Sequence, residues 1–278
     1  MASKKTLCIQ DMSSVGRCSL TVISPVLSVM GVQCIPMPTT VLSSHYGGFG
    51  NVSRQDLTDF CVDSLKEFRR IGMDFDCVLS GFLASEQQVQ LVKSAFEYAE
   101  NAVKICDPVM ADNGRFYSSV TPQIAHGIKH LCGCADIITP NVTEAAILLE
   151  QDYESVDYTQ QQVVYMADAL RRKYNCAVII TGVKTTDNNV NCYIASKNSA
   201  EVHTVQCNYI PVHFPGTGDL FAAVMTASFV KGEKLETAVE KACRFVELCV
   251  KNTWAEKNVD TRFGVDLENN LKYLIDWK

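Results

Sequence analysis

The stretch "ADIITPNVTEAAILLE", residues 135–150, changes character at its middle. Its first half is a short run containing β-branched residues, which favours a strand, and Pro140 and Asn141 interrupt that run before a helical pattern begins. The same order of short β-branched run, polar loop and amphipathic segment recurs along the chain. This alternation is typical of an α/β fold with a largely parallel sheet.

Extending this pattern outward predicts most of the secondary structure. We predict strands at residues 6–10, 33–42, 76–82, 102–109, 135–141 and 176–183. We predict helices at residues 18–31, 54–72, 85–101, 121–133, 142–151, 160–175, about 218–231 and 235–252. Residues 187–210 alternate β-branched and polar side chains around "SKNSAE", which predicts an antiparallel hairpin at the sheet edge. Since no linker or repeat is evident, we expect one domain over residues 1–278.

The composition argues against several classes of protein. A formal net charge of -6 and the lack of a long Lys/Arg block argue against binding to nucleic acid. The N-terminal residues lack the apolar core of a signal peptide, and no segment reaches the ~18 apolar residues of a membrane span. The 13 cysteines are scattered through apolar stretches, as expected of buried reduced thiols. We therefore expect a cytoplasmic protein without membrane or nucleic-acid partners.

The segment "CDPVMADNG", residues 106–114, brings two carboxylates to the end of a predicted strand. Asp107 follows the strand directly, and Asp112 lies on the loop behind it. Two carboxylates at this spacing can share a hydrated Mg²⁺, which takes oxygen ligands and keeps several waters. The alternative is that Asp107 caps a turn and that Asp112 forms a local Asx-turn with "DNG".

Asn141 and Glu144 come from the end of the next strand and from the first turn of the helix behind it. Ligands of open α/β sheets bind at the carboxyl ends of the strands, so these residues are expected at the same crevice as Asp107 and Asp112. Four converging oxygen donors suggest a metal-phosphate site. The alternative is ordinary capping, because an acidic residue is stabilised at a helix N-terminus.

The segment "HFPGTGDLFAAV", residues 213–224, suggests an anion hole. Gly216 and Gly218 permit backbone conformations that a Cβ would forbid, so successive N–H groups can point at one anion. The helix beginning near Gly218 adds its positive dipole end. Asp219 is then placed beside the anion, where it can accept the proton of an attacking hydroxyl during phosphoryl transfer. The alternative is a plain N-cap before an apolar helix.

Other nucleotide and hydrolase signatures are missing. The sequence has no P-loop, no G-x-G-x-x-G after the first strand and no G-x-S-x-G elbow. His126 and His130 have the i, i+4 spacing of zinc ligands, but without a third ligand nearby we interpret them as solvent-facing helix residues.

Taken together, "DPVMADNG", "ITPNVTEA" and "GTGDLFAA", in this order and at these distances, resemble the ribokinase-like superfamily and most closely its pyridoxal kinases. The resemblance covers nearly the whole chain. It implies a three-layer fold, with a central mostly parallel sheet flanked by helices. It also implies ATP-dependent phosphorylation of a hydroxymethyl group with Mg²⁺, often with a monovalent cation such as K⁺, by a homodimer.

The resemblance also implies roles for individual residues. Asp219 matches the catalytic base, and Gly216, Thr217 and Gly218 match the anion hole. Asp112 and Glu144 match contacts to Mg²⁺, partly through water. The positions that match the Mg-ATP site are Asp107, Asp112, Tyr117, Thr139, Asn141, Glu144 and Thr181.

The implied vitamin pocket departs from the family pattern. Pyridoxal kinases commonly have serine at the pyridine ring, whereas this chain has Asp11 in "IQD". A carboxylate there can pair with a protonated ring nitrogen, or it can point elsewhere and leave Ser13 or Ser14 to act. His45 of "SSHYGGF" is kept, but Tyr46 replaces a threonine. Phe82 of "SGFL" stands where a tyrosine often flanks the substrate, which keeps an aromatic face without the hydroxyl.

Three hypotheses follow. The first is a kinase for pyridoxal, pyridoxamine and pyridoxine. The second is a hydroxymethylpyrimidine (phosphate) kinase, although the "AGxDxSGGAG" opening of those enzymes is absent. The third is a non-catalytic relative that binds vitamin B6 or a nucleotide, against which the intact "GTGD" argues.

Overall fold

The computed structural model describes residues 3–154, 158–185 and 189–275. The chain forms two compact units. The first combines Met1–Leu79 with Ile210–Lys278, and the second is the continuous segment Ser80–Tyr209. The first unit is therefore interrupted in sequence by the second.

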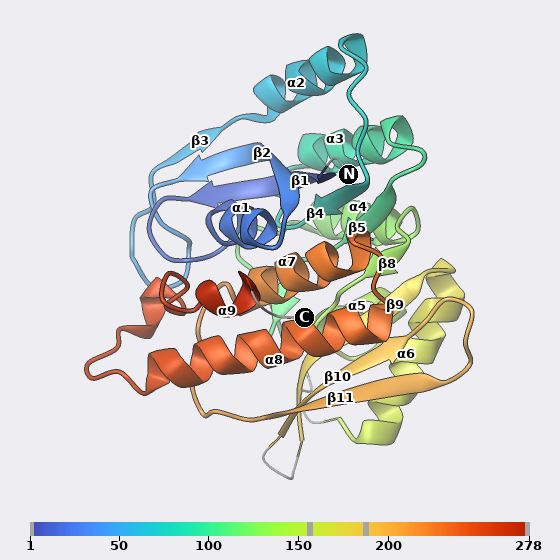
Figure 1. The fold of residues 1–278 in the computed structure, drawn as a ribbon. Coiled ribbons are helices and arrows are strands. Elements are labelled where there is room, and N and C mark those ends of the chain that lie inside the picture. Colours follow the sequence, from blue (N-terminus) through green and yellow to red (C-terminus); the bar gives the residue numbers. More distant parts are fainter. Residues whose placement is uncertain (1–2, 155–157, 186–188, 276–278) are drawn as a thin grey trace. The chain divides into compact units, whose positions relative to one another are not determined.

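In the first unit the strands follow the order β4-β1-β2-β3 (Figure 1). β1 and β2 are parallel, and β3 is antiparallel to β2. The elements are β1 Lys4–Ser13, α1 Leu20–Val29, β2 Val32–Leu42, β3 Arg54–Asp56, α2 Thr58–Arg70, β4 Cys77–Ser80 at the unit boundary, α7 Thr217–Val230, α8 Leu235–Trp254, the 3-10 helix η1 Thr261–Phe263 and α9 Lys272–Ile275.

In the second unit the strands follow the order β11-β10-β9-β8-β5. β5, β8 and β9 are parallel neighbours, and β10 and β11 form an antiparallel hairpin at the edge. The elements are α3 Glu86–Tyr98, β5 Val103–Cys106, β6 Ala111–Asp112, β7 Arg115–Phe116, α4 Pro122–Cys132, β8 Ile137–Ile138, α5 Val142–Leu149, α6 Gln160–Tyr174, β9 Ala177–Lys184, β10 Asn189–Ala195 and β11 Val202–Asn208.

The predicted alternation and the edge hairpin are confirmed. The first residues of that hairpin prediction, 187–188, lie outside the described residues. Two local predictions were wrong. Residues 54–56, predicted as the start of a helix, pair with β2 as the edge strand β3. The loop after β5 contains a second, two-stranded sheet of β6 and β7, because the left-handed backbone of Asn113 and Gly114 reverses the chain tightly.

Two features of the first unit concern the elements that carry Asp11 and Asp219. The β1–β2 ladder shifts register between Gln10 and Met12, so Asp11 lies at an irregular point of the ladder. Such irregularities change the direction in which a side chain points. α7 is buried from Leu220 to Ser228, which explains its apolar sequence on every face.

The described helices give no sign of a membrane span: none combines the length and the apolar character that crossing a bilayer requires. The 13 cysteines are all free thiols, and all but two of them are buried.

Candidate active site

The loop before α7 approaches another part of the chain so closely that no side chain fits. Gly216 is the N-cap of α7 with φ 80° and ψ 0°. A Cβ there would lie 2.0 Å from the carbonyl oxygen of Arg17. Both the left-handed backbone and the contact therefore require glycine at 216. Thr217 begins the helix, and its hydroxyl donates to the Phe214 carbonyl over 3.2 Å.

The backbone conformation expected for Gly218 was wrong. Gly218 lies inside α7, it does not adopt a positive φ, and nothing lies within 4 Å of a Cβ added to it. The backbone of α7 would therefore accept a side chain at this position. Of the two glycines, only Gly216 is required by the conformation of the loop.

Asp219 is the third residue of α7, but it does not cap that helix. One carboxylate oxygen accepts the backbone N–H of Ser19 over 2.7 Å, and the other lies 3.5 Å from the side-chain nitrogen of Gln10. The N-cap alternative is therefore wrong. Burial raises the pKa of Asp219 to about 7, and the nearby charge of Asp11 adds to this effect, whereas the two hydrogen bonds oppose it. Such a carboxylate can accept a proton near neutral pH.

Asp11 lies next to this carboxylate and is itself buried. It accepts hydrogen bonds from the hydroxyls of Ser13 over 3.1 Å and Ser19 over 2.6 Å. Burial raises the pKa of Asp11, although both hydroxyls and the nearby His45 lower it. The structure thus brings the predicted residues Asp11 and Asp219 together and links both to Ser19.

The loop after β2 carries His45 and Tyr46. The His45 ring is held at both nitrogens: Nδ1 accepts the N–H of Gly47 over 2.9 Å, and Nε2 lies 2.7 Å from the Arg262 carbonyl. Nε2 must therefore carry the proton. The Tyr46 side chain is 47% exposed, so it remains accessible to a ligand. His45 thus fixes the loop, and Tyr46 is the residue of the pair that is presented to solvent.

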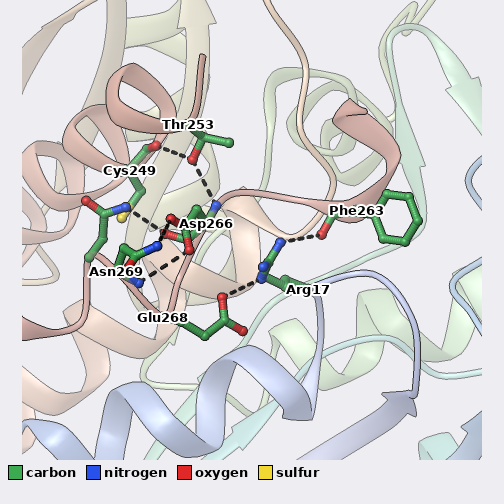
Figure 2. A network of polar contacts seen from close by, with 8 residues as sticks. Arg17, Cys249, Thr253, Phe263, Asp266, Glu268 and Asn269 are labelled. Atoms are coloured by element: carbon green, nitrogen blue, oxygen red, sulfur yellow. Dashed lines mark hydrogen bonds and ion pairs between the residues drawn. The ribbon is translucent and has the colours of Figure 1, made fainter. Parts of the chain in front are cut away.

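A contribution that we did not predict comes from residues 260–270 (Figure 2). The Arg17 guanidinium donates to Glu268 over 2.7 Å and to the Phe263 carbonyl over 3.4 Å. The backbone N–H of Arg17 also donates to Phe263. This network attaches the segment between β1 and α1 to the end of the chain. The sequence offers no signal for it, because its partners are about 250 residues apart and lack a motif.

Three candidate residues of the second unit, Asp107, Asn141 and Glu144, lie around the N-terminus of α5. Asn141 caps the helix, and Glu144 completes a capping box with it. The buried carboxylate of Glu144 accepts three backbone N–H groups: Met110 over 3.0 Å, Ala111 over 3.4 Å and Asn141 over 2.9 Å. Burial, together with the charge of Asp107, raises the pKa of Glu144. Here the capping alternative is confirmed, and Asp107 lies close by.

Asp112 lies in the β6–β7 hairpin. Its carboxylate accepts both the backbone N–H of Asn113 over 2.8 Å and the side-chain amide of Asn113 over 2.9 Å. The Asx-turn of the alternative interpretation is not formed, because the N–H of Gly114 donates to the Thr143 hydroxyl over 3.1 Å and not to Asp112. Tyr117 follows the hairpin and is 41% exposed.

Three further predicted positions lie at strand ends. Thr139 follows β8, and its buried hydroxyl has no hydrogen-bond partner among the described residues. Thr181 in β9 forms an isolated bridge with Asn141, and its N–H donates to the Pro140 carbonyl. Phe82 follows β4 and is half-buried.

No metal centre is preformed within the part of the chain that the structure describes, because no group of three or more His, Cys, Asp or Glu residues there could hold an ion. His126 and His130 are exposed on α4 with their Nε2 atoms 3.1 Å apart, which agrees with the solvent-facing interpretation.

The chain is similar to proteins named as kinases along nearly its whole length. The phosphomethylpyrimidine kinase family model matches residues 27–262. A candidate phosphomethylpyrimidine kinase from Bacteroides thetaiotaomicron, crystallised with pyridoxal, is 34% identical, with a TM-score of 0.91 over 98% of this chain and 96% of that one. The pyridoxal kinase of Lactobacillus plantarum is 28% identical, with a TM-score of 0.90 over the same shares. The pyridoxal kinase PdxY of Leifsonia xyli is 28% identical over 247 residues, 85% of each chain.

Proposed function

The chain belongs to the phosphomethylpyrimidine kinase family and has the ribokinase-like fold, and from this premise we propose that it is an ATP-dependent pyridoxal kinase. It would phosphorylate the 5′-hydroxymethyl group of pyridoxal, pyridoxamine or pyridoxine. The observation that carries this proposal is Asp219, a carboxylate with a pKa of about 7 in the first turn of α7 that does not cap its own helix. A general base works best when its pKa lies near the working pH.

In the proposed reaction the hydroxyl oxygen of the substrate attacks the γ-phosphorus of ATP. The bond from this phosphorus to the bridging oxygen breaks, ADP leaves, and the hydroxyl proton passes to Asp219. The backbone N–H groups of Gly216, Thr217 and Gly218 lie at the start of α7, where the helix dipole favours negative charge. We assign to them the stabilisation of charge on the transferring phosphoryl group.

We assign Mg-ATP binding to Asp107, Asp112, Tyr117, Thr139, Asn141, Glu144 and Thr181. The carboxylates of Asp107 and Glu144 repel each other, and a bound cation would relieve this repulsion. Mg²⁺ keeps several waters and takes ligands from phosphates, so a site without a full set of protein ligands fits this ion. The hydrogen bonds that already hold Asp112 and Glu144 favour contacts to Mg²⁺ through water. Bound Mg²⁺ would neutralise phosphate charge during transfer.

We assign substrate binding to Asp11, His45, Tyr46 and Phe82. Tyr46 offers an exposed aromatic ring for a flat substrate, and His45 holds the loop that carries it. Asp11 favours a protonated ring nitrogen, because burial disfavours the charge of its carboxylate and a cation beside it would offset this cost. The same features favour hydroxymethylpyrimidine, which is also a flat nitrogen heterocycle, and the matching family model supports this second candidate.

The test is turnover with ATP and Mg²⁺, assayed separately on the three B6 vitamers and on hydroxymethylpyrimidine. We expect a 5′-phosphate product from at least one vitamer, detected by mass spectrometry. Turnover of hydroxymethylpyrimidine alone would replace the first candidate by the second. Binding of a vitamer or of ATP without any turnover would favour the non-catalytic hypothesis.

We also propose that residues 1–278 act as one functional domain in a cytoplasmic homodimer. The family match over residues 27–262 includes parts of both units, which supports the first statement. Light scattering on the purified protein tests the second, and a monomer at all concentrations would refute it. Activity in K⁺ compared with Na⁺ tests the requirement for a monovalent cation.

A further inference from the structure

Ser19 occupies an unusual position at the start of α1. It is the N-cap of that helix, but its side chain makes no cap hydrogen bond, unlike Ser85, Thr121 and Thr159 at the N-caps of other helices. Its hydroxyl donates instead to Asp11 over 2.6 Å. A serine N-cap stabilises a helix by accepting a backbone N–H, so Ser19 gives up this role for a contact with a carboxylate.

The backbone of Ser19 is strained in the same place. Its φ of 54° and ψ of -140° lie near a region of backbone conformation that is occupied almost only by glycine. The other N-caps with hydroxyl side chains, such as Ser85 and Thr159, have ordinary extended backbones. Strain of this kind persists only where the surroundings fix the conformation.

The strained backbone directs the N–H of Ser19 at Asp219, and the two atoms are 2.7 Å apart. Arg17, two residues before Ser19, is itself held in place. Arg17 is bonded to Glu268 and Phe263 (Figure 2). Gly216 also lies against the Arg17 carbonyl. Ser19 is 7% exposed, so it has little freedom to relax.

We propose that Ser19 is a positioning residue for the base: its N–H orients the Asp219 carboxylate, and its hydroxyl, bonded to Asp11, holds the backbone in the conformation that this requires. The inference rests on the proposed role of Asp219. It adds a coupling between Asp11 and Asp219, because both carboxylates accept hydrogen bonds from Ser19. Asp11 accepts from the hydroxyl, and Asp219 accepts from the backbone N–H. One Asp219 oxygen is thereby fixed, and the other, with its longer contact to Gln10, is left to receive the proton.

The ionisable groups around the pair set the expected direction of a pH effect. Asp11 and Cys18 lie close to Asp219, and His45 lies close to Asp11. The hydroxyl of Ser19 lowers the pKa of Asp11, and the charge of Asp11 raises the pKa of Asp219. Without that hydroxyl, Asp11 would protonate more readily, and its repulsion of Asp219 would weaken. The pKa of Asp219 should then fall.

Ser19→Gly and Ser19→Ala form a matched pair for the test. Both variants lack the hydroxyl, but glycine adopts the observed backbone without strain and alanine does not. In Ser19→Gly we expect the N–H to remain on Asp219 and the acid limb of the kcat/KM profile to move to lower pH. In Ser19→Ala the backbone relaxes and the N–H is withdrawn, so kcat should be at least about 10-fold below that of Ser19→Gly. The acid limb of the alanine variant should lie at higher pH than that of the glycine variant, because both lack the hydroxyl and only the alanine variant loses the N–H that lowers the pKa of Asp219.

A readout independent of turnover separates this inference from the proposed function. Carbon-13 NMR titration of the aspartate carboxyls measures the pKa of Asp219 in each Ser19 variant, even if the protein proves to have no kinase activity. The Asp219 signal is assigned by its loss in Asp219→Asn. In the Asp11→Asn background, Ser19→Gly should cause no further shift. Equal kcat values and identical Asp219 titrations in the glycine and alanine variants would overturn the inference. If the alanine variant does not fold, an unshifted Asp219 titration in Ser19→Gly overturns the proposed coupling.

Discussion

Helices α5 and α7 both carry an acidic residue at the third helical position, and in both cases burial raises the pKa of that residue. Glu144 of α5 is bonded to the N-cap of its own helix and to the backbone of Met110 and Ala111. Asp219 of α7 is bonded to Ser19 and Gln10, which come from β1 and the segment behind it. Sequence position alone therefore does not distinguish a carboxylate that caps its own helix from one bonded to other elements, whereas the hydrogen-bond partners do.

The largest effect is expected at Asp219, the acidic residue that does not cap its own helix. Asp219→Asn should lower kcat by about 100-fold to 10,000-fold, because the proton acceptor is lost while the shape of the side chain is kept. ATP binding, measured by calorimetry, should remain. A variant with near wild-type kcat would mean that the two helix starts do not differ in function.

The next effect concerns the start of α7, which has no side-chain cap. Gly216→Ala should lower the free energy of unfolding by about 2 kcal/mol or more, because of the positive φ and the clash with the Arg17 carbonyl. Gly218→Ala is the matched control. It should leave stability unchanged or raise it by up to about 1 kcal/mol, since residue 218 is helical with open space around it. Urea unfolding of both variants is the measurement, and equal losses would contradict the distinction.

A smaller effect is expected at the N-cap of α5. Asn141→Ala removes half of the capping box and also the bond to the Ala111 carbonyl. We expect a loss of about 1–2 kcal/mol in the free energy of unfolding, measured without nucleotide. Asn141→Asp is the control for the cap alone, because aspartate keeps the acceptor for the Glu144 N–H but, like alanine, cannot donate to the Ala111 carbonyl. A stability equal to wild type in Asn141→Ala would show that the box contributes little.

The smallest effect concerns stability and pH. Between the usual pKa of 3.8 and the raised value of about 7, the folded protein keeps a proton on Asp219 that the unfolded chain has lost. The free energy of unfolding should therefore fall as pH rises through this interval, and the change should end above it. Asp219→Asn removes this dependence, so the free energy of unfolding of the variant should exceed that of wild type at pH 8 by an amount on the order of 1 kcal/mol, and by less at pH 5. A constant difference at the two pH values would contradict this explanation.

Much of the fold could be predicted because it depends on local patterns. Runs such as residues 176–183 have the composition of buried strands, and Ser85 and Thr159 cap the helices behind them, as the structure shows. The strand β3 could not be predicted, because three exposed polar residues form it only by pairing with β2. The two-residue strands β6 and β7 are equally invisible to periodicity.

The candidate site could be predicted only as far as its motifs extend. Asp219 and Gly216 belong to one short segment, and Asn141 and Glu144 to another. Ser19 and Arg17 belong to neither, because their roles depend on partners 200 residues or more away in the chain. At Gly218 the motif instead predicted too much. Glycine recurs in the motif there, but the backbone conformation of residue 218 does not require it.

The order of the units along the chain has a consequence for biosynthesis. Residues 80–209 form one continuous unit, and all of its residues are synthesised before the segment from residue 210 onward. The other unit needs residues from both sides of it, and Ser19 meets Asp219 only after the segment from residue 210 onward has emerged. The nascent chain would therefore contain all residues of the continuous unit well before Ser19 and Asp219 can meet.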